Sequence, residues 1–159
     1  DADLFDNHES PGAGTSYTET SVLSTAAAVL DKAMFLITFN GHSFDIPTLI
    51  HRMRINEVTI PAILTRAAAQ KPWEREPHLD VLNVCTFGGA TWRYSLEAYC
   101  IAYGIENPKA EGDGSHVEEL IRTRDGAGLL KYLTGDLRST EKLWRAVTQQ
   151  PAAQTELPD

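Results

Sequence analysis

The stretch LITFNGHSFDIPTLIHR, residues 36–52, decides the fold, because it joins an apolar strand to a polar turn and then to a helix. The nearly unbroken apolar run FLITF (35–39) is typical of a strand that is covered on both faces. Gly41 breaks this run, and Pro47 suits the first turn of the following helix, where an amide hydrogen would have no partner. Open α/β sheets place ligand sites at such strand ends. We therefore expect a layered α/β domain with a site at residues 40–45.

Helical periodicity is found on both sides of this stretch. Ser16 and Glu19 have the spacing of a capping box, and the apolar residues after them predict a helix to about Lys32. The longest helix is expected over residues 126–147. Its predicted buried face consists of Leu130, Leu133, Leu137, Trp144 and Val147. Further expected elements are a strand over 79–83 and helices that include 94–103 and 117–121. This order favours a layered α/β domain over a helical bundle.

The composition is that of one globular domain, with 159 residues, 42% of them hydrophobic and 23% charged. We expect a flexible segment at 1–15, a domain at 16–148 and a disordered tail at 149–159. The sequence contains no run of about 20 apolar residues, so we expect no membrane span. Cys85 and Cys100 form no CxxC pair, which favours a reduced, cytoplasmic protein, with a disulfide between them as the alternative.

The chain is acidic, with 14 Lys and Arg residues against 22 Asp and Glu residues and a formal net charge of −8. Proteins that bind nucleic acid usually carry a basic surface, so this balance argues against an extensive phosphate-binding face. It still allows an enzyme that holds phosphates through metal ions, since metal-binding acids add negative charge themselves. The five histidines lack metal-ligand spacing, which argues against a zinc site. Arg52, Arg54 and Arg93 are interpreted as solvated charges, with strand binding as the alternative.

Two polar places in the sequence are candidates for chemistry. Asp45 is expected at a helix N-terminus, where the helix dipole favours the ionised carboxylate that a metal ion needs. The alternative is that Ser43 or Asp45 simply caps the helix. Tyr132 and Asp136 lie four residues apart and therefore project from one face of the final helix. The alternative there is a Tyr at the rim of the core and a solvated Asp.

Together these segments resemble two motifs of a nuclease family. Residues 36–52 are similar to its second motif, in which an Asn and a Phe-Asp pair follow a strand. KYLTGDLRST (131–140) is similar to its third motif, a Tyr, three residues and then an Asp. Between these two motifs, residues 77–80, 95–105 and 114–117 also resemble segments of the same family. Over residues 16–147 the chain resembles the predicted 3′–5′ exonucleases related to the exonuclease domain of family-B DNA polymerases. These belong to the ribonuclease H-like superfamily with four metal-binding acids, in its Tyr-containing branch.

The resemblance implies a mixed sheet flanked by helices and a two-metal hydrolysis at single-stranded DNA or RNA 3′ ends. Asp45 and Asp136 would bind Mg²⁺ or Mn²⁺ ions that lie roughly 3.5–4 Å apart in an intact site. Tyr132 would orient the attacking water or help to deprotonate it. The residues implied to bind the terminal nucleotide are Asn40, Gly41, His42 and Phe44, and those implied to support the site are Asp80 and Thr140.

The family's first motif, Asp-x-Glu on the first strand, is missing before the 35–39 strand. Asp1 and Asp3 come closest to it, and we expect neither to replace it. The chain is therefore expected to lack the N-terminal strands and, with two acids, to hold metal weakly. It is interpreted as an exonuclease, a truncated fragment of one, or an inactive module that binds or scaffolds a partner. An exposed sheet edge would favour a protein partner or a dimer. A related bacterial ribonuclease H-like nuclease that shares the NGxSFD turn is a narrower alternative.

Overall fold

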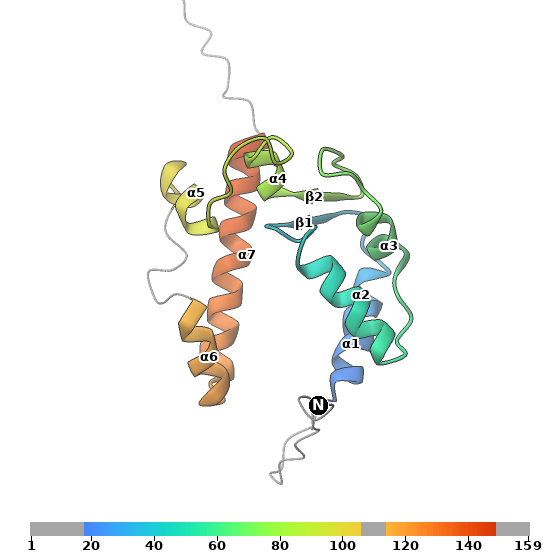
Figure 1. Ribbon diagram of the computed structural model, residues 1–159. Coiled ribbons are helices and arrows are strands. Elements are labelled where there is room, and N and C mark those ends of the chain that lie inside the picture. Colours follow the sequence, from blue (N-terminus) through green and yellow to red (C-terminus); the bar gives the residue numbers. More distant parts are fainter. Residues whose placement is uncertain (1–17, 106–113, 149–159) are drawn as a thin grey trace, which may run out of the picture.

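The computed structural model describes residues 18–105 and 114–148, and Figure 1 shows their arrangement. The segments expected to be flexible at 1–15 and disordered at 149–159 lie outside the described residues. In the part that is described, no helix is long and apolar enough to cross a membrane.

The sheet of the described residues consists of two parallel strands, β1 (Leu36–Thr38) and β2 (His78–Asp80). In their register Leu36 lies opposite His78 and Thr38 opposite Asp80. The chain crosses between them through α2 (Asp45–Ile55) and α3 (Ala62–Ala68). A parallel pair with a helical crossover confirms the expected α/β class. The predicted strand over 79–83 is wrong beyond Asp80, because the Asp80 side chain accepts a hydrogen bond from the Leu82 amide and caps α4 (Val81–Cys85).

Helices cover both faces of this sheet, as the apolar run predicted (Figure 1). On one face, Leu36 packs against a core cluster formed by α1 (Glu19–Leu30), α2 and α3. On the other face, Ile37 and Phe39 pack against a second cluster that contains Leu79, Val81 and Leu143. Successive side chains of a strand point to opposite faces, which explains this alternation. The strand is nevertheless only half-buried, because among the described residues β1 pairs on one side alone.

The start of α1 differs from the sequence prediction. Its N-cap is Thr18, whose side-chain oxygen accepts a hydrogen bond from the Ser21 amide at 3.2 Å, so the predicted cap at Ser16 is wrong. Either residue type can cap a helix, and spacing alone did not separate them. Glu19 instead forms an ion pair with Arg52 and thereby joins α1 to α2. Arg52 is therefore not the solvated charge that the sequence predicted.

The long helix α7 (Gly126–Thr148) forms the centre of the second half of the chain, with α4, α5 (Leu96–Ala102) and α6 (Gly114–Arg122) packed on it. Trp144 and Val147 pack on the second cluster, as predicted. The predicted burial of the leucines nearer the start of α7 is wrong, because these side chains are exposed: Leu130 (67%), Leu133 (48%) and Leu137 (70%). The two-stranded sheet covers α7 near Leu143, and the described residues offer no second surface for the leucine face.

Candidate functional site

The polar turn that follows β1 is held by the carboxylate of Asp80, at the end of β2. Asp80 is 5% exposed and its two oxygens accept hydrogen bonds from the amides of Asn40 (2.8 Å), His42 (3.1 Å) and Leu82 (3.0 Å). Hydrogen bonds to an ionised acceptor are about twice as strong as neutral ones. Asp80 therefore fixes the conformation of the turn from the neighbouring strand. It is used as an anchor for amides, which leaves few of its lone pairs for a ligand.

Close packing inside the turn requires a glycine at position 41. The Gly41 amide donates to the Thr38 side-chain oxygen at 3.1 Å, and a Cβ on Gly41 would lie 2.2 Å from that oxygen. Asn40 has a φ of 66°, a left-handed conformation that Asn adopts more readily than most residues. The Asn-Gly pair is thus demanded by the backbone of the turn, independently of any ligand.

His78 lies beneath the turn as a buried imidazole. Its Nε2 is 2.7 Å from the Thr38 side-chain oxygen, and its ring stacks on that of His42 with centroids 6.4 Å apart. Thr38 already accepts the Gly41 amide, so its hydroxyl hydrogen is available for donation to the Nε2 of a neutral His78. Burial, as the main cause, lowers the pKa of His78, with the attraction of Asp80 opposing it. The imidazole is therefore held in its neutral form.

We expect the free energy of unfolding to decrease as the pH falls below about 6.5. The unfolded chain protonates His78 near its ordinary pKa of 6.5, whereas the lowered pKa keeps the folded imidazole neutral to a lower pH. The stabilisation is therefore complete above 6.5 and is lost as the pH falls through the folded pKa. Urea unfolding at about pH 7.5 and about pH 5.5 measures it. His78→Gln should flatten the pH dependence and His51→Gln, at an exposed position, should not; equal slopes for both variants would contradict the expectation.

Asp45 is the first residue of α2, and its environment differs from the sequence interpretation. Partial desolvation of its carboxyl group raises the pKa, a backbone hydrogen bond opposes this, and the charge of Asp80 raises it further. The net direction is a raised pKa, which opposes the ionised form that the position at a helix N-terminus was expected to favour. The alternative of a helix cap is also wrong, because Phe44 takes the N-cap position without a side-chain hydrogen bond. Asp45 is thus a surface residue whose carboxyl group is partly desolvated and lies within reach of the charge of Asp80.

The α7 residues of the candidate site lie along one face of that helix. Tyr132 and Asp136 are half-buried, and Thr140 is buried. The charge of Asp136 contributes to a raised pKa of Cys100 on α5, after burial of the thiol. Among the described residues, no three His, Cys, Asp or Glu side chains are grouped so that they could hold a metal ion. The structure therefore brings Asp45 and Asp80 near each other, but does not join Asp136 to them as a metal-binding group.

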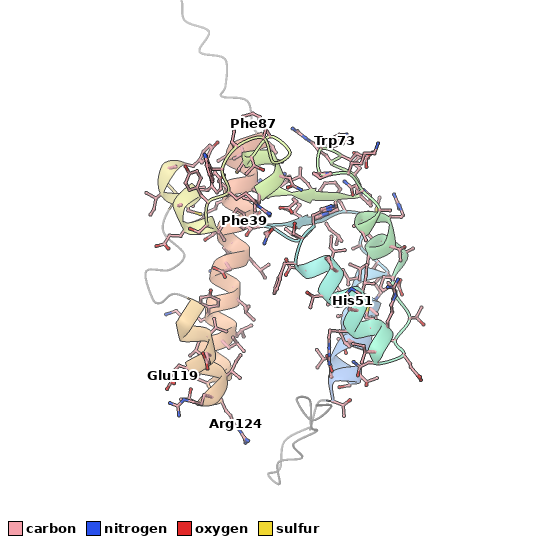
Figure 2. All side chains as sticks on the ribbon, in the orientation of Figure 1. Phe39, His51, Trp73, Phe87, Glu119 and Arg124 are labelled. Carbon is pink, nitrogen blue, oxygen red and sulfur yellow. The ribbon has the colours of Figure 1, made fainter. Side chains whose placement is uncertain are left out.

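Arg93 joins the site through a contact that was not predicted from the sequence. The residue is exposed, as expected for a surface charge, but its guanidinium donates a hydrogen bond to the side-chain oxygen of Asn40. The two residues are 53 positions apart, so no local spacing could predict the pair. Thr38 and His78 were missed for the same reason, since their roles come from strand pairing. Figure 2 shows Phe39, the last apolar residue before the turn, at the end of β1 that lies next to α7.

Cysteine chemistry is not favoured at this site. Cys85 and Cys100 are both free thiols, so the alternative of a disulfide is not realised. Burial, helped by the charge of Asp80, raises the pKa of Cys85 to about 11. The thiol is therefore protonated at neutral pH and is a weak nucleophile.

The comparison with known families agrees with the two motifs on which the site is built. The family described as "Predicted 3'-5' exonuclease related to the exonuclease domain of PolB" matches residues 13–151. No curated protein matches the chain, and no solved structure matches it. The matched range includes both strands, every described helix and each candidate residue. The chain therefore belongs to the predicted 3′–5′ exonucleases related to the exonuclease domain of PolB.

Proposed function

We propose that this chain acts in the metal-dependent removal of nucleotides from 3′ ends of single-stranded DNA or RNA. The observation that carries the proposal is the polar turn at residues 40–45, held by Asp80 at the carboxyl ends of both strands. Ligand sites of α/β sheets lie at this position, and the family match supports the reaction class. We place the protein in the cytoplasm, where thiols such as Cys85 and Cys100 stay reduced.

The proposed roles follow from the position of each side chain. The turn residues Asn40, Gly41 and His42, with the exposed ring of Phe44, would contact the terminal nucleotide. Tyr132 would orient water, and Asp80 and Thr140 would support the site, Asp80 through its bonds to the turn amides. The described acids do not form a complete metal-binding set, because Asp80 is engaged by amides and no three His, Cys, Asp or Glu side chains among these residues are grouped to hold a metal ion. Asp45 and Asp136 are the candidate ligands for Mg²⁺ or Mn²⁺, which prefer carboxylate oxygens.

We expect the chain to shorten a 5′-labelled single-stranded oligonucleotide from its 3′ end in Mn²⁺, and to stop when the metal is chelated. Asp45→Asn and Asp136→Asn should each lower the rate by about 100-fold or more, because each would remove a metal ligand. Asp31→Asn, an exposed acid at the end of α1, is the matched control and should leave the rate unchanged. Gel analysis of product lengths measures this. Shortening that survives both site substitutions would overturn the assignment of these acids.

A second candidate function is an inactive module that recruits a strand to the edge of β1 that has no partner strand among the described residues. The Leu36 amide points toward β2 and donates to the Pro77 carbonyl at 2.9 Å. Because successive backbone amides of a strand point to opposite sides, the Ile37 amide points away from β2. Exposed strand edges of this kind invite pairing with another chain or a second copy. Two results together would favour this function over catalysis. The folded protein would leave the oligonucleotide intact, and the Ile37 amide would become protected from hydrogen exchange when the protein associates.

A further inference from the structure

The segment between α4 and α5 exposes large aromatic side chains beside the candidate site. Trp92 is 83% exposed, and Tyr94, two residues further on, is also exposed. Residues 89–93, Trp92 among them, line a shallow and widely open depression of the surface. Exposed apolar surface of this kind in a folded protein marks places where ligands or partners bind. We call residues 89–94 the Trp92 platform.

The backbone of the Trp92 platform is anchored, although its aromatic rings are exposed. The buried Thr86 accepts the amide of Gly89 at its side chain (3.2 Å) and the amide of Thr91 at its carbonyl (3.1 Å). The Tyr99 hydroxyl donates to the Trp92 carbonyl at 3.3 Å. The Tyr94 ring packs edge-on against that of Tyr99, with centroids 5.9 Å apart. The platform can therefore present its indole to a ligand without first having to be ordered.

The platform is connected directly to the turn at residues 40–45. Arg93, between the two aromatic residues, donates its hydrogen bond to the Asn40 side chain. Residues 81–96 contain no Asp or Glu, although the whole chain has 22 of them. A negatively charged ligand could therefore approach the turn across the platform without meeting an acid from this segment, with Arg93 available for a charge-assisted contact.

We propose that the Trp92 platform binds single-stranded nucleic acid, with a base stacked on Trp92 and a phosphate at Arg93. Stacking on aromatic rings combined with cationic contacts is how proteins bind unpaired strands, because the faces of unpaired bases are accessible. The Arg93–Asn40 contact places the phosphate position next to the turn. This inference rests on the proposed function, and it adds where the strand lies before its end reaches the turn.

The test is intrinsic fluorescence during titration with a short oligothymidine in EDTA, where no hydrolysis takes place. The wild-type emission should be quenched, because a stacked base quenches the indole. Trp92→Phe should abolish the quench and nearly retain the affinity, whereas Trp92→Ala should weaken binding about tenfold. Trp73→Phe and Trp73→Ala are matched controls at another exposed tryptophan, 68% exposed, and should change neither quench nor affinity. Arg93→Ala should reduce the slope of log affinity against log salt by about 0.7, the value for one phosphate on a single strand.

The platform would be overturned by a quench that persists in Trp92→Phe, by an equal loss of affinity in Trp73→Ala, or by equal binding of a blunt duplex of the same length. The readout separates this proposal from the proposed function, because binding is measured without metal. Binding that depends on Trp92 in a chain that shortens no oligonucleotide would overturn catalysis and retain the platform. Shortening at an unchanged rate in Trp92→Ala, with unchanged affinity, would overturn the platform alone.

Discussion

Asp80→Ala is expected to lower the free energy of unfolding by about 3 kcal/mol, a large part of the stability of a domain of this size. The substitution removes the acceptor of three backbone amides and leaves those of Asn40, His42 and Leu82 without their charged partner. Each lost bond to an ionised group costs more than a neutral one, although water can reach part of the turn and reduce the total. Urea unfolding followed by circular dichroism measures the change.

The control for this substitution is Asp31→Ala, at an exposed position after α1, which should change stability by less than about 0.5 kcal/mol. Asp80→Asn should fall between the two, because one amide oxygen remains as an acceptor. A chain with Ala at position 80 that is as stable as the Asp31→Ala control would show that Asp80 does not hold the turn.

Gly41→Ala is expected to destabilise the chain by about 2 kcal/mol and to displace the turn. The new Cβ would lie 2.2 Å from the Thr38 side-chain oxygen and 2.7 Å from its methyl carbon, so the turn or the strand must move. Because Asn40 and His42 belong to this turn, we expect activity on the oligonucleotide to fall with it. Thermal and urea unfolding measure the first effect, and the rate of shortening measures the second.

Gly126→Ala is the matched control, because a Cβ there meets no atom within 4 Å and the position begins a helix. A double-mutant cycle adds a second check. Thr38→Gly removes the oxygen, the methyl group and the Cβ that the new Cβ would meet at 2.2, 2.7 and 2.5 Å, so the double variant should lose less stability than the sum of the two single changes. Additive losses, or a Gly41→Ala variant as stable as the control, would contradict the steric explanation.

The sequence predicted those elements whose signal is local. The apolar run before Asn40 identified β1, helical periodicity identified α2 and α7, and the motifs at residues 36–52 and 131–140 identified the family. Such signals depend only on residues that are close in sequence, so they do not change with the elements that pack around them.

The remaining features depend on contacts between distant residues. The resemblance implied that Asp80 supports the site, but not that it holds a turn 40 positions away, which follows from the pairing of the two strands. The exposed face of α7 at Leu133 and Leu137 shows the same limit, because periodicity predicts which side of a helix is apolar but not whether another element covers it. The placement of Asp45 and Asp136 on one shared metal site stays a prediction from the motifs.

The two core clusters differ in how soon they can form during synthesis. The first is built from residues 23–67 and is complete once that short stretch has left the ribosome. The second needs Leu143, which at typical elongation rates is made roughly 4–15 s later. For that interval Ile37 and Phe39 lie on a nascent strand whose cover has not yet been translated. A chaperone that shields short apolar strands would therefore be most useful to this protein between these two moments.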